Sequence, residues 1–278
     1  SNTSSIPISQ LSVGRTDEFK KFFCGTHFFN PPRYLRLLEI IPIAETQPEL
    51  VEFLMHFGEI NLGKQTVLCK DTPAFIANRI GVMSGLKVFD LTQKYDLTIE
   101  EVDVLTGAII GRPNTGTYRL QDLVGLDTGE KVTQFVVNNV KNDSFFESVG
   151  KATETKFMTF LMRNNFLGNK TGKGFYQKTD QKDENGRTVV YALDLKTLEY
   201  KPSTRPKNPI LKEAKAIEKM KKRMLFLISK EGKESLFLKD YFTAVFAYAA
   251  QLVPKISDQY YPLDDAMRAG YVWDFGPF

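Results

Sequence analysis

The chain has 278 residues, enough for one large domain or two of ordinary size. Hydrophobic residues make up 42% and charged residues 25%, which excludes a disordered, collagen-like or mainly transmembrane chain. The formal net charge of +4 is too small to indicate a nucleic-acid partner by itself. With two cysteines and two histidines, the composition argues against a disulfide scaffold and a His/Cys metal cluster, and it favours the reducing cytoplasm.

The two ends of the chain show no targeting pattern. Residues 1–10 lack a charged segment followed by a long apolar one, and no run of about 18 apolar residues occurs, so we predict neither a signal peptide nor a membrane span. Residues 271–278 are mostly aromatic or apolar, whereas chain ends are usually polar. We expect that the chain stops inside a folded unit; the alternative is an end that docks on a core.

Residues 35–69 have the pattern of a strand, a helix and a second strand. The apolar run 35–43 predicts a buried strand, and residues 65–69 predict another. Between them, Thr46 and Glu49 have the spacing of a capping box at the start of a helix. The apolar face of that helix is expected to consist of Leu50, Phe53, Leu54 and Phe57. A unit of this length is typical of βαβ folds.

Helices are predicted for most of the chain beyond residue 71. Thr98 and Glu101 form a second capping-box pattern, and a loop rich in glycine and proline follows at 111–116. The predicted helices cover residues 72–95, the segment from Thr98 to before Gly111, 129–141 and 152–164. The fold class is therefore mainly α with a small α/β part.

A small hairpin and a basic segment follow. Residues 188–194 and 197–201 are predicted to form the hairpin, and three prolines from 202 to 209 mark a linker. Residues 205–233 contain ten Lys/Arg and three Asp/Glu. Such a run most often forms a solvated helix face, and contact with cofactor phosphates or nucleic acid is the alternative.

An internal repeat relates residues 75–120 to residues 237–278. Both stretches are predicted to contain a long apolar helix, an acidic helix and a Gly/Pro loop, with Val102-Asp103 aligned to Leu263-Asp264. Repeats of this kind usually form stacked or pseudo-symmetric units. We therefore expect the two helical parts to pack on each other, or to form a homodimer.

A histidine and a carboxylate stand out as candidates for chemistry. Glu39 lies within the apolar strand 35–43, and a buried carboxylate is costly without a partner. His27 precedes this strand by a proline-containing turn, so it is the expected partner. A carboxylate that orients an imidazole makes a general base, although a single such pair is structural more often than catalytic.

The surrounding residues resemble a known family. His27 begins His-Phe-Phe-Asn-Pro-Pro, Glu39 follows, and residues 69–79 read CKDTPAFIANR, which together resemble the 3-hydroxyacyl-CoA dehydrogenases of fatty-acid β-oxidation. Residues 2–5 (NTSS), 124–127 (VGLD), 170–176 (KTGKGFY), 264–267 (DDAM) and 273–278 (WDFGPF) resemble further motifs of that family. The resemblance covers nearly the whole chain and is closest to the long multifunctional bacterial type, which has two helical domains.

The resemblance implies roles for individual residues. His27 is expected to take the proton of the substrate 3-hydroxyl while the hydride goes to NAD, and Glu39 to orient it. Ser4 and Asn78 match residues that hydrogen-bond around the reacting oxygen of the acyl-CoA. Asn2 and Asn30 match residues of the cofactor region. No metal, nucleic acid or membrane span is expected.

The sequence contains no G-x-G-x-x-G, the turn whose backbone N–H groups hold the cofactor pyrophosphate. The chain is therefore interpreted as a piece of the dehydrogenase, inactive by itself, truncated at both ends and cytoplasmic. Its predicted parts are the C-terminal part of a Rossmann NAD-binding domain, a helical C-terminal domain, a hairpin with linker, and a partial second helical repeat, at residues 1–70, 71–178, 179–209 and 210–278. The alternative function is a helical module for dimerisation or substrate binding without catalysis.

Overall fold

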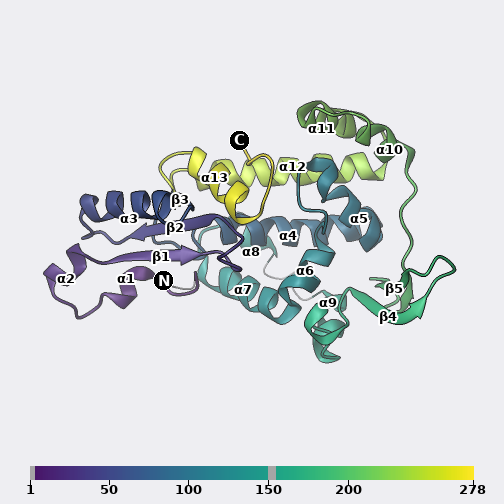
Figure 1. Ribbon diagram of the computed structural model, residues 1–278, viewed down its shortest axis with the longest axis horizontal. Helices are drawn as coiled ribbons and strands as arrows, with labels where there is room; N and C mark the ends of the chain where they lie inside the picture. The colour runs from purple at the N-terminus through teal and green to yellow at the C-terminus, as the bar shows by residue number, and fades with distance from the viewer. Residues whose placement is uncertain (1–3, 150–154) are drawn as a thin grey trace. The chain divides into compact units, whose positions relative to one another are not determined.

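A computed structural model describes residues 4–149 and 155–278 of the chain (Figure 1). The chain divides into two compact units. Unit 1 consists of Ser1–Met83, Asn138–Lys141 and Ala244–Phe278. Unit 2 consists of Ser84–Val137 and Asn142–Thr243. The domain boundaries expected from the sequence stay a prediction.

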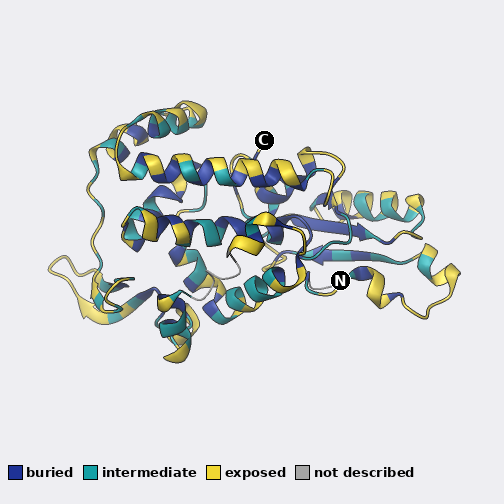
Figure 2. Ribbon diagram, turned by 180° about the vertical axis from the view of Figure 1, so that it is seen from behind, coloured by how far each residue is buried: buried dark blue, intermediate teal, exposed yellow. Residues whose placement is uncertain are grey.

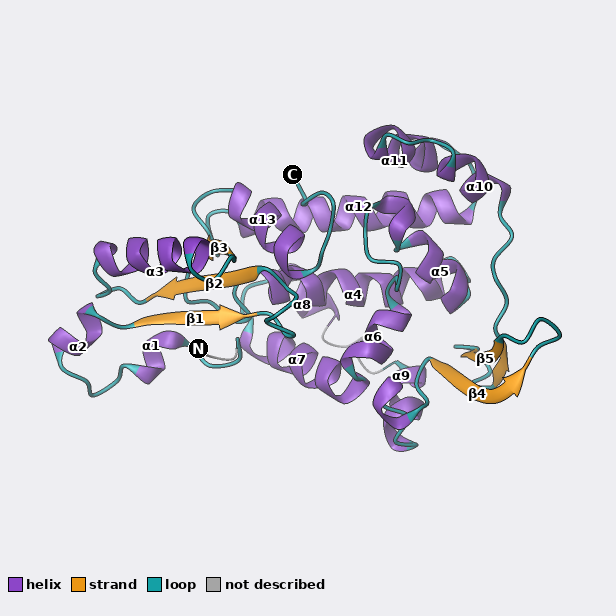
Figure 3. Ribbon diagram, in the orientation of Figure 1, coloured by secondary structure: helices purple, strands orange, loops and turns teal. Residues whose placement is uncertain are grey.

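Most described elements of the chain are helices, and the strands form two small sheets (Figure 3). Unit 1 contains α1 (Ile8–Leu11), α2 (Asp17–Lys21), β1 (Cys24–Phe28), β2 (Leu37–Pro42), α3 (Pro48–Ile60), β3 (Gln65–Leu68) and α13 (Tyr261–Gly270). Two long helices, α4 (Ala77–Lys94) and α12 (Lys233–Leu252), contribute residues to both units. The fold class is mainly α with a small α/β part, as the sequence predicts.

Unit 2 holds the remaining helices and the second sheet. Its elements are α5 (Ile99–Leu105), η1 (Ala108–Ile110), α6 (Tyr118–Val124), most of α7 (Leu126–Asn139), α8 (Ser144–Val149), α9 (Lys156–Arg163), η2 (Asn169–Thr171), β4 (Tyr176–Lys182), β5 (Thr188–Leu193), β6 (Tyr200–Pro202), α10 (Pro209–Lys215) and α11 (Met220–Ser229). The basic run therefore forms two short helices, and its lysines at 212, 215, 219, 221 and 222 are exposed to solvent.

The sheet of unit 1 places the candidate histidine opposite the candidate carboxylate. Its strand order is β1-β2-β3. β1 and β2 are antiparallel, and His27 is the register partner of Glu39. β2 and β3 are parallel and are connected through α3, which confirms the predicted strand–helix–strand unit.

Strand β2 is covered on both faces. A Cβ on Gly58 of α3 would lie 3.0 Å from the Leu38 side chain, and a Cβ on Gly270 at the end of α13 would lie 2.7 Å from that of Leu37. Neighbouring residues of a strand point to opposite faces, so α3 and α13 cover opposite faces of the sheet. Glu39 points to the same face as Leu37. Burial on both sides explains the continuous apolar run, and the strand is dark along its length in Figure 2.

Two expectations for α3 are wrong. Thr46 does not cap this helix: its hydroxyl donates to the Phe23 carbonyl and accepts from the Ile43 N–H, so it ties two chain segments together. Gln47 is the N-cap, and Pro48 begins the helix. The expected apolar face is also open, because Phe53 and Phe57 stack on each other but are 59% and 39% exposed.

Helix α4 begins later than the sequence pattern indicates. Ala74 and Phe75 both have positive φ, 66° and 50°, so residues 72–76 form a turn and the helix starts at Ala77. Side chains with a Cβ rarely adopt this conformation. A turn of this kind stores strain and marks a place where the chain is held by its surroundings.

In unit 2 the second capping box is confirmed and the sheet is larger than predicted. Thr98 accepts from the Glu101 N–H, and the Glu101 side chain accepts from the Thr98 N–H. The expected hairpin is formed by β5 and β6, but β4 adds a third strand that pairs with β5. Most of β4 is exposed and polar, so it lacks the alternation that identifies a half-buried strand. Helix α8 was also not predicted.

Candidate active site

The candidate histidine and carboxylate form a close pair inside unit 1. His27 Nδ1 lies 2.6 Å from Glu39 Oε2, within the range expected from the sequence. The Glu39 side chain is completely buried, whereas 10% of the His27 side chain is exposed. A carboxylate only accepts hydrogen bonds, so Nδ1 carries the proton and Nε2 keeps its lone pair. The imidazole is thus oriented at one nitrogen and able to take a proton at the other.

Backbone donors at the start of α4 hold the second oxygen of Glu39. The N–H groups of Ile76 and Ala77 donate to Oε1, at 3.1 and 3.0 Å. Donors in the first turn of a helix have no partner within the helix, and they favour a negative charge. The strained turn before Ala77 therefore has a clear consequence: it aims two N–H groups at a buried carboxylate.

Ser4 and Asn78 are brought together at the same turn. The Asn78 side-chain amide donates to Ser4 Oγ at 2.9 Å, and the Ala74 N–H donates to the Ser4 carbonyl at 3.1 Å. Ser4 is only 7% exposed. Asn78 follows directly on Ala77, which donates to Glu39, and the ring of Phe75 lies edge-on to His27 with centroids 5.4 Å apart. The turn at residues 72–76 therefore contacts Ser4, His27 and Glu39, and Asn78 follows it at the start of α4.

The two remaining candidates are placed differently. Asn30 follows β1 and is exposed to solvent, three residues beyond His27. Asn2 lies outside the described residues. The structure thus brings His27, Glu39, Ser4 and Asn78 together, while the expected cofactor contacts of these two asparagines stay predictions.

The backbone donors of Ile76 and Ala77 were missed by sequence reasoning. A signal for them exists, because an ionised carboxylate accepts several hydrogen bonds and a single histidine cannot supply them all. The position of these donors depends on the positive φ of Ala74 and Phe75, which the residue types do not indicate.

The two cysteines and the second histidine offer no further reactive group at this site. Burial raises the pKa of Cys24 to about 11, and the pKa of Cys69 is raised by burial and by the charge of Glu39. A thiol with a raised pKa is a poor nucleophile at neutral pH. His56 is exposed on α3.

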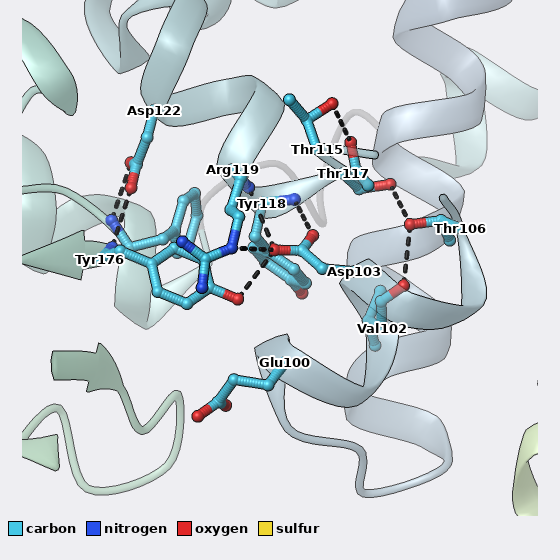
Figure 4. Close-up of polar contacts among 12 residues, drawn as sticks. Glu100, Val102, Asp103, Thr106, Thr115, Thr117, Tyr118, Arg119, Asp122 and Tyr176 are labelled. Carbon is cyan, nitrogen blue, oxygen red and sulfur yellow. Dashed lines mark hydrogen bonds and ion pairs between the residues drawn. The ribbon is translucent and has the colours of Figure 1, made fainter. Parts of the chain in front are cut away.

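Unit 2 contains a second buried carboxylate with several partners, here called the Asp103 cluster: Asp103, Tyr118, Arg119 and Tyr176 (Figure 4). Asp103 accepts from the Tyr118 N–H at 2.6 Å, the Arg119 N–H at 3.2 Å and the Tyr176 hydroxyl at 2.8 Å. The Arg119 guanidinium lies over the Tyr176 ring. Burial raises the pKa of Asp103 to about 7.

A cavity of about 730 Å³ borders the Asp103 cluster, with Glu100, Arg119 and Tyr176 among its lining residues. A carboxyl group with a shifted pKa beside a cavity is a candidate for function. Both oxygens of Asp103 are occupied by donors, however, and Tyr176 uses its hydroxyl proton on Asp103. We therefore interpret the cluster as structural.

The described residues contain neither a candidate metal site nor a helix that could cross a membrane. No group of three or more His, Cys, Asp and Glu side chains within residues 4–149 and 155–278 could hold a metal ion. No helix in the same ranges is both long enough and apolar enough to cross a membrane.

Comparison with protein families matches two consecutive parts of the chain. Residues 1–72 match the NAD-binding domain of 3-hydroxyacyl-CoA dehydrogenase. Residues 75–178 match the C-terminal domain of the same enzyme. The turn at residues 72–76, which contacts Ser4, His27 and Glu39, lies where the two matches meet.

Individual relatives extend over the whole chain. A Bacillus subtilis protein named as a 3-hydroxyacyl-CoA dehydrogenase is 41% identical over 278 residues, which are 100% of this chain and 34% of the relative. A Rickettsia prowazekii protein named as a fatty acid oxidation complex trifunctional enzyme is 30% identical, over 100% of this chain and 36% of the relative. The chain thus spans about a third of the length of these curated relatives.

A solved structure shares the fold. The crystal structure of 3-hydroxybutyryl-CoA dehydrogenase from Escherichia coli K12 matches with a TM-score of 0.65 at 20% identity, over 100% of this chain and 66% of that chain. At this identity the likeness concerns the fold alone. The assignment rests on the two domain matches and on the relatives that match along the whole of this chain. The chain belongs to the 3-hydroxyacyl-CoA dehydrogenase family.

Proposed function

We propose that this chain is the part of a longer, NAD-dependent dehydrogenase that carries the proton-transfer site, and that the enzyme oxidises (S)-3-hydroxyacyl-CoA to 3-oxoacyl-CoA. The observation that carries the proposal is the 2.6 Å contact between His27 Nδ1 and Glu39, which leaves the second ring nitrogen, Nε2, for proton transfer. Family membership supplies the reaction type, and the geometry supplies a base suited to it.

The proton and the hydride leave the substrate alcohol separately. His27 Nε2 takes the proton of the 3-hydroxyl as its O–H bond breaks, and Glu39 stabilises the imidazolium that forms. The electron pair of the O–H bond forms the C3=O double bond as the C3–H bond breaks, and NAD bound to the longer protein would accept that hydride. In the reverse direction, the imidazolium returns the proton to the developing alkoxide.

Ser4 and Asn78 are proposed to position the reacting oxygen. A hydroxyl and an amide 2.9 Å apart offer neutral donors beside the base, and neutral donors suit an oxygen that gains partial charge during the reaction. Ser4 accepts from Ala74, two residues before the N–H groups of Ile76 and Ala77 that donate to Glu39. The position of Ser4 and Asn78 is therefore linked to that of the His27–Glu39 pair.

The residues present fit the reacting end of the cofactor better than its phosphates. His27, Ser4 and Asn78 form a polar set suited to a nicotinamide and a substrate oxygen, and Asn30 is a proposed neighbour. The 278 residues contain no G-x-G-x-x-G for the pyrophosphate. We propose that the chain by itself binds NAD weakly and has little activity.

A second copy of the helical domain is proposed to begin within the chain. Asp103 accepts from the Tyr118 N–H, and Asp264 accepts from the Phe278 N–H. In each case a glycine two residues before the donor, Gly116 or Gly276, lies so close to the aspartate that a Cβ would collide with it. The same local arrangement at aligned positions supports the repeat.

Contacts of helix α12 support the packing of the two copies on each other. In unit 1, Arg79 of α4 donates to the Tyr248 hydroxyl at 2.7 Å. In unit 2, Ser84 of the same helix hydrogen-bonds the Tyr241 hydroxyl. A homodimer is the other form proposed for the helical parts, and the cytoplasm is the proposed location.

The test uses the longer protein, with His56 as a matched control. The wild-type protein should reduce acetoacetyl-CoA with NADH, His27→Gln should lose most of this activity, and His56→Gln should keep it. The 278-residue chain should show little activity.

No reduction by the longer wild-type protein, or full activity of His27→Gln, would contradict the proposal. Binding of acyl-CoA in titration without any turnover would favour the alternative, a helical substrate-binding module.

A further inference from the structure

The end of helix α13 packs against the sheet beside the His27–Glu39 pair. A Cβ on Gly270 would lie 2.7 Å from the Leu37 side chain and 3.3 Å from the Phe29 ring. Leu37 and Glu39 point to the same face of β2, because they are two residues apart on one strand. The chain segment that follows α13 therefore lies on the face of the sheet that carries the pair.

An aromatic chain connects this segment to the imidazole. The ring of Tyr271 meets the ring of Phe29 edge-on, with centroids 5.9 Å apart. Phe29 in turn meets His27 edge-on at 5.4 Å. Edge-to-face contacts of this length fix the relative orientation of rings. His27 is thus oriented by Glu39 at Nδ1 and by Phe29 at its ring.

The Tyr271 phenol packs against helix α4 at Gly81, where the absence of a side chain leaves space for the ring. A Cβ on Gly81 would collide with the phenol oxygen and its carbon, so any larger residue at 81 would displace the ring. Gly81 lies three and four residues after Asn78 and Ala77, and residues at these spacings share a helix face. The phenol therefore contacts the face of α4 that holds the amide of Asn78 and the backbone anchor of Glu39.

The electrostatic environment agrees with this position. The pKa of Tyr271 is raised by burial and further by the charge of Glu39, which shows that the phenol is within electrostatic reach of the carboxylate. Tyr271 is thus an uncharged group near neutral pH, so it adds no second negative charge beside Glu39.

We infer that Tyr271 is a positioning residue of the His27–Glu39 pair, acting through Phe29, and that Gly81 is the residue that admits it. This inference rests on the proposed function for its effect on catalysis. Its structural part, the orientation of the imidazole by Tyr271, can be measured independently.

The structural test uses the two histidines of the chain as probes. Nitrogen NMR of the imidazoles is recorded for the wild-type 278-residue chain, Tyr271→Ala, Tyr271→Phe and the exposed control Tyr260→Phe. Tyr271→Ala should shift the His27 signals and leave those of His56 in place. Tyr271→Phe keeps the ring and should restore most of the wild-type His27 signals, and Tyr260→Phe should change neither histidine.

A comparison of glycines tests the second half of the inference. Gly85 lies on the same helix, and a Cβ there would have its nearest neighbour at 3.7 Å, an ordinary contact. Gly81→Ala should shift the His27 signals, whereas Gly85→Ala should not. In the Tyr271→Ala background, Gly81→Ala should have no further effect on them.

The kinetic test uses the longer protein. Tyr271→Ala should lower kcat by about 10- to 100-fold with KM changed less than about twofold, because misplacing a base by about 1 Å affects the chemical step rather than binding. A folded Tyr271→Ala variant with unchanged His27 signals and unchanged kcat would overturn the inference. If the wild-type protein reduces no acetoacetyl-CoA, the proposed function fails, and the NMR experiment still decides whether Tyr271 orients His27.

Discussion

The His27–Glu39 pair and the Asp103 cluster each stabilise a buried carboxylate with hydrogen bonds, but the partners of the two carboxylates differ. In both, a buried carboxylate accepts two backbone N–H groups at the start of a following helix, α4 for Glu39 and α6 for Asp103. The remaining hydrogen-bond capacity of Asp103 is taken by the Tyr176 hydroxyl, which keeps no second proton to exchange. The remaining oxygen of Glu39 binds Nδ1 of the His27 imidazole, and the second ring nitrogen, Nε2, is left for proton exchange.

This difference distinguishes the carboxylate that we interpret as structural, Asp103, from the one that we propose to act in catalysis, Glu39. Burial and hydrogen bonds are shared by both sites, and burial raises the pKa of Asp103 to about 7. The capacity for chemistry depends on an atom that is oriented yet unused, and only His27 offers one.

The largest effect is expected for Glu39→Gln in the longer protein. The fold should be kept, because an amide oxygen can still accept from Ile76 and Ala77. The kcat should fall by about 10²- to 10⁴-fold, the range of general-base contributions, because the imidazolium loses its charged partner. Steady-state kinetics with circular dichroism as a check on folding measure this, and Asp103→Asn serves as the control with a near wild-type kcat. Equal losses in both variants would remove the distinction between the sites.

Asp122→Ala should affect stability rather than catalysis. Asp122 accepts from the Phe175 and Tyr176 N–H groups, both at 2.8 Å, and it is 3% exposed. Each buried donor left without a partner costs about 1–3 kcal/mol, so the free energy of unfolding should fall by about 2–6 kcal/mol. Chemical denaturation measures this fall. A loss below about 1 kcal/mol would show that water replaces the carboxylate at this site.

Asp103 should make stability depend on pH. Its pKa is about 7 in the folded chain and 3.8 as the reference for an exposed aspartate, so between these values the folded state binds more protons than the unfolded state. The contribution to stability is therefore greatest below pH 3.8, falls as pH rises and is constant above about pH 7. Three pKa units correspond to about 4 kcal/mol.

The measurement compares wild type with Asp103→Asn in urea at several pH values. The difference in unfolding free energy between the two proteins should change between pH 4 and 7, because the variant lacks the titrating group. A difference that is independent of pH across this window would contradict the assignment of the raised pKa to Asp103.

Thr98→Ala should have the smallest effect. Thr98 caps α5, the helix that carries Asp103, and the loss of a capping threonine typically costs about 1 kcal/mol. Thermal unfolding should show this loss, and the change in stability between pH 4 and 7 should stay as in wild type. A flattened pH dependence would show that the position of Asp103 depends on the cap.

Local sequence rules succeeded where a segment's neighbours in the chain are also its neighbours in space. The capping box at Thr98 and Glu101 forms as predicted, because all of its partners lie within four residues. The same pattern at Thr46 and Glu49 failed, because Phe23 offers the Thr46 hydroxyl a carbonyl from a distant segment. Strand β4 was missed because its polar side chains face solvent.

The family, the βαβ unit and the pairing of His27 with Glu39 could all be predicted from the residues alone. A buried carboxylate requires a partner, the two prolines before β2 allow a tight return, and few other groups were available. The groups that hold the second oxygen of Glu39 and orient the imidazole ring could not be predicted, because they come from packing between distant segments. The Ile76 and Ala77 donors depend on a strained turn, and Tyr271 is brought to Phe29 by a helix more than 230 residues further along the chain. Contacts of this kind arise from packing across the sheet, and no local pattern of residues encodes them.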